Sequence, residues 1–161
     1  MRYFLLPDTH LGHHKMLEIG RPADYEARIL TTLIRTVKSG DVLIHLGDVA
    51  LGWSFEKVEN FFKIPGHKIL VRGNHDKHWS NTKWLKIFDA VVDGIVIKDV
   101  LFTHVATYTD YLNIHAHSHL GLEHGWYLPD ACLLSLEEMN YNVINLEKVL
   151  AWRLKRWREI L

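Results

Sequence analysis

The sequence predicts an α/β or α+β sheet protein. Short apolar runs alternate with segments of helical periodicity in the first half of the chain, and strand-like runs dominate the second half. This order differs from that of a helical bundle, in which one helical pattern would follow another. A length of 161 residues, with 48% hydrophobic and 24% charged residues, suits one globular domain over residues 1–161.

Several short apolar runs have the composition of buried strands. They are Tyr3–Leu6, Val42–Leu46, Lys68–Val71 and Val100–Thr103, with Asn113–Ala116 as a weaker candidate. The runs Val91–Asp93 and Ile95–Lys98 lie on either side of Gly94, and this spacing suggests a β-hairpin.

Apolar residues at helical spacing predict helices between these strands and at the end of the chain. The predicted helices are Asp24–Lys38, a segment that begins at Ser54 and ends before Pro65, about Ser80–Phe88, and Asn145–Leu161. Asp24 and Ser54 are residue types that cap helix N-termini. The basic residues of the last segment predict a solvated helix face, with a partner, nucleic acid or membrane contact as the alternative.

The charge balance and the single cysteine narrow the class of protein. Nineteen basic residues balance nineteen acidic ones, which argues against strong nucleic-acid binding through a broadly basic face but not against a small nucleotide. Cys132 alone excludes an intrachain disulfide and fits a reducing compartment. No run approaches the roughly 20 apolar residues of a membrane-spanning helix, so we expect a cytoplasmic protein.

Twelve residues are histidine, and the positions of several are informative. Residue types that bind metals follow five predicted strands: Asp8 and His10, Gly47 and Asp48, Gly73 to Asp76, His104, and His115, His117 and His119. Ligands of open α/β sheets bind beyond the carboxyl ends of the strands, so these side chains should meet at one place. The three alternating histidines alone could equally form an exposed strand face. All the blocks together predict a metal site.

Three other metal chemistries fit this pattern less well. A zincin protease needs His-Glu-x-x-His, which the chain lacks. A single catalytic zinc with three protein ligands would leave most of these residues unused. A metallo-β-lactamase-type hydrolase continues its His-x-His-x pattern with Asp-His, whereas Leu120 and Gly121 follow His119 here.

The arrangement resembles the calcineurin-like metallophosphoesterase superfamily. The family blocks D-x-H, G-D, G-N-H-D/E, H and G-H-x-H correspond to Asp8-Thr9-His10, Gly47-Asp48, Gly73-Asn74-His75-Asp76, His104 and Ala116-His117-Ser118-His119. The resemblance implies a four-layer αββα sandwich, in which helices flank two mixed β-sheets and a dinuclear metal site lies at the carboxyl ends of the strands.

Local features refine this resemblance. The stretch from Asp8 to His13, with Arg21 later, is similar to the small phage or bacterial type of the family. Two positions depart from the family pattern. Ala116 replaces a glycine and so narrows the backbone conformations just before His117, and Ala106 replaces a proline that often follows the fourth block.

The resemblance also implies the ligands of two divalent metal ions. One ion would bind Asp8, His10 and His119, the other Asn74, His104 and His117, and Asp48 would bridge them. Two such ions bring a charge of +4, and the two aspartates bring −2, so the loaded site keeps about +2, which suits an anionic phosphate ester. Ligands of nitrogen and oxygen without thiolate favour Mn²⁺, with Fe²⁺, Zn²⁺ or Ni²⁺ as alternatives.

The implied reaction is in-line attack of a metal-bound hydroxide on phosphorus. His75 is the expected general acid, and Asp76 or Asp48 would orient it. Candidates for contact with the substrate phosphate are His13, Arg72 and Asn74, with Arg21 as a weaker one. His45 is expected to be a satisfied core residue, and His115 is a candidate for a supporting or substrate role.

The substrate is expected to be a small, nucleotide-like or model phosphodiester. Only twelve residues separate His104 from His117, too few for a capping domain, so the site should be open. Aromatic residues in or near loops could stack on a base, although packing is their more usual role: Trp53, Trp79, Tyr108, Tyr111, Trp126 and Tyr127. A phosphomonoesterase, a nuclease and a catalytically silent interaction scaffold are the alternatives, and a homo-oligomer is compatible with each.

Overall fold

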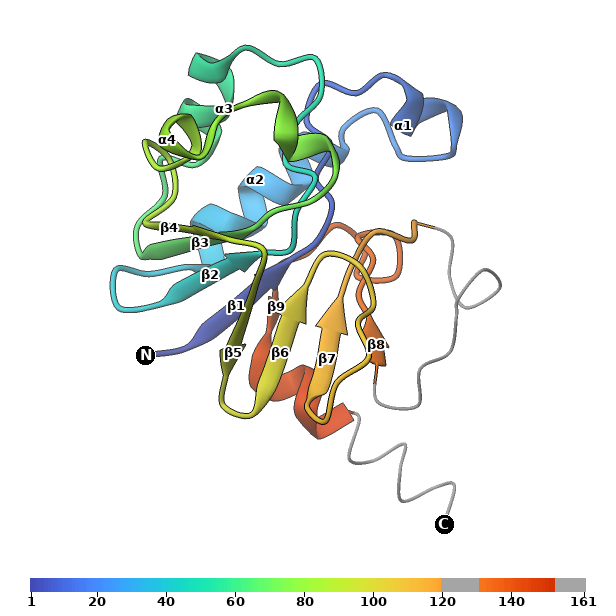
Figure 1. The fold of residues 1–161 in the computed structure, drawn as a ribbon. Helices are drawn as coiled ribbons and strands as arrows, with labels where there is room; N and C mark the ends of the chain where they lie inside the picture. Colours follow the sequence, from blue (N-terminus) through green and yellow to red (C-terminus); the bar gives the residue numbers. More distant parts are fainter. Residues whose placement is uncertain (120–130, 153–161) are drawn as a thin grey trace.

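The computed structural model describes residues 1–119 and 131–152, and it contains two mixed β-sheets (Figure 1). The first sheet has the order β4-β3-β2-β1-β9, with β1 Tyr3–Leu6, β2 Val42–His45, β3 His67–Val71, β4 Ala90–Val92 and β9 Ile144–Asn145. The second has the order β5-β6-β7-β8, with β5 Gly94–Ile97, β6 Val100–Thr103, β7 Leu112–His115 and β8 Ala131–Leu133. In each sheet one strand, β9 or β5, runs antiparallel to its neighbour, and the other pairs are parallel.

The helices are short apart from α2. Their bounds are α1 Lys15–Glu18, α2 Tyr25–Thr36, α3 Phe55–Phe61 and α4 Asn81–Trp84, with a 3-10 turn, η1, at His75–His78. Residues 146–152 are also helical, and the rest of the predicted terminal helix lies outside the described residues. The helices flank the two sheets, which confirms the predicted four-layer sandwich (Figure 1).

Two apolar layers hold the sandwich together, because alternate residues of each central strand face opposite sides. Leu43 of β2 packs with α2 and α3 residues such as Leu33 and Val58 in the layer outside the first sheet. Ile44, the next residue, packs with Phe102 of β6 in the layer between the two sheets. Strands buried on both faces need continuous apolar runs, and this explains why these strands were readable from the sequence.

The predicted hairpin around Gly94 is wrong. Residues Ala90–Val92 pair in parallel with β3 of the first sheet, whereas Gly94–Ile97 pair antiparallel with β6 of the second. One residue, Asp93, separates the two strands, which is shorter than the two-residue loop of the commonest hairpins, and the chain crosses here between sheets. The hairpin of this region is β5–β6, whose turn uses the left-handed residues Lys98 and Asp99.

The other differences concern short elements and helix ends. The helix predicted over about Ser80–Phe88 is regular only over α4, and α1, β8 and β9 were not predicted. Ser54 caps α3 as expected by accepting a hydrogen bond from the Lys57 amide. Asp24 makes no such cap, since its carboxylate pairs with Arg28 one turn later. Among the described helices, none combines the length and the apolar character that a membrane crossing requires.

Candidate metal centre

The loops that follow β1 and β2 lie side by side and bring two predicted blocks together. The His10 amide donates to the Asp48 carbonyl at 2.9 Å, and the Leu11 amide donates to the Val49 carbonyl at 3.0 Å. The second sheet joins them through the His117 amide, which donates to Asp8 Oδ2 at 2.8 Å. The carboxyl ends of strands from both sheets therefore meet at one place, as predicted.

Four of the gathered residues have left-handed backbone, which is uncommon for residues other than glycine. The φ angles are 23° at Asp8, 45° at His10, 53° at Asp48 and 74° at His117. Each such residue costs of the order of 1–3 kcal/mol unless the surroundings compensate, and such residues cluster at functional sites. The unusual backbone thus occurs at the residues whose side chains gather here.

Gly47 and Gly73 allow the close contact between the loops. A Cβ on Gly73 would lie 2.1 Å from Asp48 Oδ1 and 2.6 Å from the Asp48 amide nitrogen. A Cβ on Gly47, whose φ is +97°, would lie 2.6 Å from His104 Nδ1. Any larger residue at either position would displace a candidate ligand.

The first ligand group consists of Asp8, His10 and Asp48, whose ligand atoms lie close enough to hold one metal ion. All three are buried, and His10 Nε2 lies 3.5 Å from Asp48 Oδ2. Asp8 Oδ1 and both ring nitrogens of His10 are buried without any hydrogen-bond partner. Buried polar atoms are rarely left unpaired, and a cation bound there would satisfy Asp8 Oδ1 and one ring nitrogen of His10, the other nitrogen of the neutral ring being an N–H donor. The residues therefore fit a metal ion.

The second ligand group consists of Asp48, His104 and His117, with Asn74 beside them. His104 Nδ1 donates to the Leu46 carbonyl at 2.8 Å, which directs Nε2 into the site. This Nε2 atom lies 3.0 Å from Asn74 Oδ1, 3.0 Å from His117 Nδ1 and 3.4 Å from Asp48 Oδ2. Oxygen and nitrogen atoms that converge in this way also fit a divalent cation.

The pKa values of these groups reflect burial and mutual charge. Burial raises the pKa of the Asp8 carboxyl to about 8, and it lowers the pKa of His10 to about 3, so His10 is neutral and its lone pair is available. Burial works to lower the pKa of His104, but the hydrogen bond to Asp48 and the charges of Asp8 and Asp48 outweigh it and raise the pKa to about 9. A divalent cation in the second group would take the place of that proton and compensate the carboxylates.

His75 lies on the open side of the two groups. Its amide donates to Asp48 Oδ1 at 2.9 Å, and its Nε2 lies 4.0 Å from Asp48 Oδ2. Its side chain is 40% exposed, and its ring centroid lies 5.4 Å from that of His10. The imidazole is thus close to the site and open to solvent.

Asp76 lies away from His75, in the packing beneath the loops. Its oxygens accept hydrogen bonds from the amides of Asp48, Val49 and Gly73 at 2.8–2.9 Å. Its side chain is fully buried. The carboxylate therefore holds the second and third blocks together, and no described hydrogen bond joins it to the His75 imidazole.

The predicted phosphate contacts differ in their surroundings. His13 lies beside the first group, with its ring centroid 5.5 Å from His10 and 6.3 Å from His75. Arg72 bonds Asp93 and Asn81 through its guanidinium, so its side chain is held at the ends of β3 and β4. Asn74 is exposed and bonds His104.

Arg21 and Glu137 lie close to the first block, Asp8-Thr9-His10. Arg21 is buried, and it bonds the carbonyls of Asp8 and Thr9 and the ring of His119. Glu137, which pairs with Arg21, was not predicted, and no local motif marks it. His119 lies beside the first group, with its ring centroid 4.8 Å from that of His10.

His45 is a buried residue with both ring nitrogens bonded, as expected. Its Nδ1 accepts from the Gly47 amide, so Nε2 carries the proton and donates to Thr9 Oγ1 at 2.9 Å. The Thr9 hydroxyl then donates to the Val49 carbonyl at 2.7 Å. His115 contacts the Ala116 carbonyl through Nδ1 at 3.0 Å and is half-buried beside the site.

The aromatic candidates for base stacking divide into two kinds. Trp53 packs against Phe61, and Trp79 packs against Trp84, so both contribute to the apolar layer outside the first sheet. Tyr108 is 87% exposed and Tyr111 44% exposed. Trp126 and Tyr127 lie outside the described residues.

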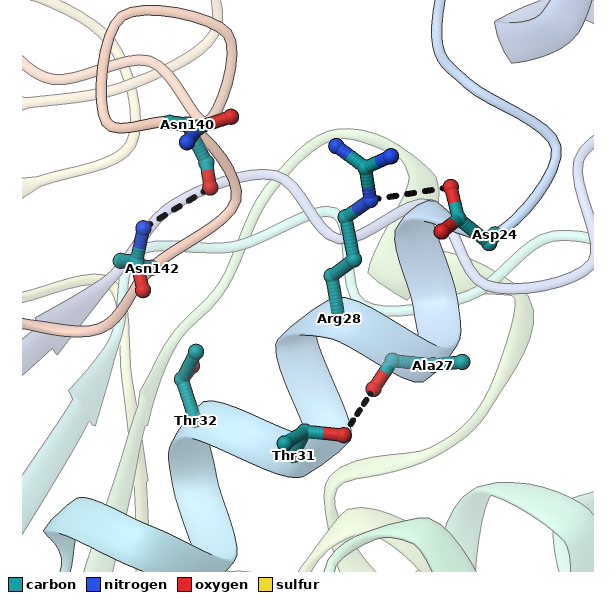
Figure 2. A pocket seen from close by; sticks show the side chains of 7 residues that line it. All are labelled: Asp24, Ala27, Arg28, Thr31, Thr32, Asn140 and Asn142. Carbon is teal, nitrogen blue, oxygen red and sulfur yellow. Dashed lines mark hydrogen bonds and ion pairs between the residues drawn. The ribbon is translucent and has the colours of Figure 1, made fainter.

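A separate groove of about 370 Å³ lies between α2 and the segment before β9 (Figure 2). Its lining residues are Asp24, Ala27, Arg28, Thr31, Thr32, Asn140 and Asn142. The two charged side chains of the lining pair with each other, Arg28 with Asp24 at 2.9 Å. None of the lining residues belongs to the two ligand groups.

The comparisons with known proteins agree with this geometry. The family model of the calcineurin-like phosphoesterases matches residues 1–158, and the chain belongs to this family. It is therefore a metal-dependent phosphoester hydrolase by family, with Asp and His clusters that fit divalent metals.

One solved structure shares the fold. It is the crystal structure of AQ665, a protein of unknown function from Aquifex aeolicus, with a TM-score of 0.76 and 24% sequence identity. The similarity covers 94% of this chain and 98% of that one. Comparison with curated proteins finds no match.

Proposed function

We propose that the protein is a dinuclear metal-dependent phosphodiesterase. The observation that carries this proposal is the position of Asp48 between the two ligand groups. Its Oδ2 atom lies 3.5 Å from His10 Nε2 and 3.4 Å from His104 Nε2. A carboxylate shared by two groups of ligands suits a bridge between two ions, and two ions suit in-line displacement at phosphorus.

The ligand sets in this proposal are Asp8, His10, His119 and Asp48 for the first ion, and Asn74, His104, His117 and Asp48 for the second. Mn²⁺ is the proposed metal, since all the donors are nitrogen or oxygen. Bound divalent ions supply Lewis-acid stabilisation of the phosphate and lower the pKa of bound water. The protein residues supply the remaining steps.

His75 is the proposed general acid. Its backbone amide bonds Asp48 Oδ1, which anchors the residue, while its half-exposed ring is free to reach the oxygen of the leaving group. Proton donation to that oxygen removes the charge that develops as the P–O bond breaks. Asp48 Oδ2, 4.0 Å from Nε2, helps to orient the ring, and Asp76 acts more remotely by holding the Asp48 and Gly73 amides.

Openness supports a diester substrate. Asn74 and His117 are exposed, and His75 is partly exposed, so one side of the site faces solvent. A diester needs room for groups on both sides of the phosphate, and an exposed site provides it. Asn74 and His13 are the proposed contacts of the phosphate oxygens. Arg72 would reach the substrate only by giving up its bonds to Asp93 and Asn81, so its part in binding is the weakest element of this assignment.

A panel of phosphate esters tests the proposal. The protein would be freed of metal, reloaded with Mn²⁺, Fe²⁺, Zn²⁺ or Ni²⁺ in turn, and assayed with bis(p-nitrophenyl) phosphate and p-nitrophenyl phosphate. We expect Mn²⁺-dependent turnover with the diester preferred. A preference for the monoester would identify a phosphomonoesterase, and cleavage of oligonucleotides alone would identify a nuclease. Inactivity with every metal and ester would favour the scaffold alternative.

A further inference from the structure

Arg21 makes an unusually complete set of contacts for a side chain with no solvent exposure. Nε donates to Glu137 Oε1 at 2.8 Å, Nη1 to the Thr9 carbonyl at 3.0 Å, and Nη2 to the Asp8 carbonyl at 2.9 Å. The guanidinium also lies over the Tyr25 ring, 5.1 Å from its centroid. A buried arginine is stable only when its charge and its donors are compensated, and Glu137 supplies the charge.

The bonds from Arg21 to the Asp8 and Thr9 carbonyls hold a segment whose backbone has positive φ angles. Asp8 and His10, on either side of Thr9, both have positive φ angles. Two carbonyls that accept from one rigid guanidinium keep their relative orientation, because the fork of an arginine is planar. The pair therefore holds the turn that directs the Asp8 and His10 side chains into the first ligand group.

The same guanidinium reaches His119, which arrives from the second sheet. Arg21 Nη2 lies 3.2 Å from His119 Nδ1, and Glu137 Oε1 lies 3.9 Å from the same atom. Glu137 Oε2 is buried and has no hydrogen-bond partner. Because an arginine only donates, the Nδ1–H that remains when Nε2 binds a metal would face the carboxylate of Glu137.

We propose that Arg21 and Glu137 are positioning residues for the first metal ion and leave the second ion unaffected. Their described hydrogen bonds and ion pairs reach Asp8, Thr9 and His119, and none reaches the side chains of Asn74, His104 or His117. The second group is linked to the Asp8 turn through a backbone group, the His117 amide that donates to Asp8 Oδ2, and not through a metal-binding atom of its own. Arg21 and Glu137 are 116 positions apart in the sequence. This inference rests on the ligand sets of the proposed function.

Two variants and one matched control test the proposal by metal titration. Arg21→Lys keeps the charge but loses the planar fork, and Glu137→Gln keeps an acceptor for Arg21 but removes the negative charge. We expect either variant to weaken binding of one Mn²⁺ ion about 10- to 100-fold, the usual effect of losing a partner of a metal ligand, while the other ion binds as in the wild type. Arg2→Lys is the control, because Arg2 also pairs with a carboxylate, that of Asp41, but at a place away from the ligand groups. We expect it to bind both ions normally.

Spectroscopy and double variants identify the weakened position. Electron paramagnetic resonance should show a spin-coupled Mn²⁺ pair in the wild type and an isolated ion in Arg21→Lys at equal metal concentration. Adding His117→Ala to Arg21→Lys should remove the ion that still binds with wild-type affinity, whereas adding His10→Ala should leave that ion in place. Wild-type affinity for both ions in both variants, or equal weakening of the two ions, would overturn the proposal.

Two other results are informative in the same experiment. If Arg21→Lys does not fold, Glu137→Gln carries the test, because the Glu137 side chain is 28% exposed and tolerates the change better. If the wild type itself binds fewer than two ions, the dinuclear site of the proposed function fails, and this inference fails with it. Two ions bound with wild-type affinity in both variants would overturn this inference alone.

Discussion

The two ligand groups differ in how completely the protein prepares them for a cation. In the first, Asp8 and His10 are buried, and Asp8 Oδ1 and the His10 nitrogens have no partner. In the second, His104 contacts Asn74 and His117, both of which are exposed. The first group thus has buried ligand atoms without hydrogen-bond partners. In the second group the ligand atoms contact one another, and two of the residues are exposed to solvent.

In the dinuclear site that we propose, this difference gives the two metal positions different tasks. A ligand set that is already arranged and shielded from water loses little entropy when it binds, so the first position should hold its ion more tightly. The second group must separate before a cation enters, but its exposed members can also meet a substrate. The buried position is suited to holding an ion, and the exposed one to exchange and catalysis.

Asp48→Asn changes a ligand that both groups share, and it should have the largest effect of the substitutions. Both groups use Asp48 Oδ2, and an amide cannot offer the same charge to two cations. Loss of one preorganised stabilising group costs about 10²- to 10³-fold in rate, so we expect a loss of kcat of at least about 10³-fold. Elemental analysis should find fewer than two ions per chain. Unchanged stoichiometry would contradict the bridging role.

His75→Ala tests whether the open side carries the proton donor. We expect two bound ions and a loss of kcat of about 10²-fold or more with an alkyl leaving group, since general acid catalysis contributes about 10²- to 10⁴-fold. The loss should be smaller with p-nitrophenolate, which leaves without protonation. Steady-state kinetics with both esters measures this difference, and an equal loss for the two leaving groups would argue against proton donation.

His10→Ala and His117→Ala sharpen the contrast in affinity. In a Mn²⁺ titration, His117→Ala should keep the tighter ion and His10→Ala should lose it, because His10 belongs to the buried group. We expect the two wild-type affinities to differ by about 10-fold or more, equivalent to about 1.4 kcal/mol. Isothermal titration calorimetry separates the two sites. Tight binding that survives in His10→Ala would reverse the assignment.

Ala116→Gly should have the smallest effect. Ala116 is buried and its φ is not positive, whereas the following residue, His117, has a φ of 74°. The left-handed residue is thus the ligand itself, and the alanine costs no strain. We expect a glycine here to lower the free energy of unfolding by about 0.5–1 kcal/mol, through greater freedom of the unfolded chain, with metal binding unchanged. Chemical denaturation measures the change, and a gain in metal affinity would show that the alanine disturbs His117.

The strands and the types of ligand were readable because both are local. A run such as Val42–Leu46 is apolar on both faces, and the residues that follow it are Gly47 and Asp48, so strand and loop are adjacent in the sequence. The central strands, and the ligand blocks that come directly after them, could therefore be predicted from such runs. The short elements α1 and β9 carry too few residues for a periodic signal.

Contacts between segments that are distant in the sequence could not be predicted in this way, because no local pattern specifies them. The strands around Gly94 have the spacing of a hairpin, but spacing along the chain does not specify which strand is the neighbour, and the structure places them in separate sheets. Asp76 follows His75 in the sequence, yet its carboxylate bonds amides 27 and 28 positions earlier. Its place in the packing could not be predicted from the motif alone.

The sequence by itself determined which residues can bind metal and at which ends of the strands they lie, because ligand chemistry and strand periodicity are properties of neighbouring residues. Only the tertiary structure decided that one Asp48 oxygen lies between His10 and His104, and that Arg21, paired with Glu137, bonds the Asp8 and Thr9 carbonyls. These contacts depend on distances between segments far apart in the chain, which packing sets and no local pattern records.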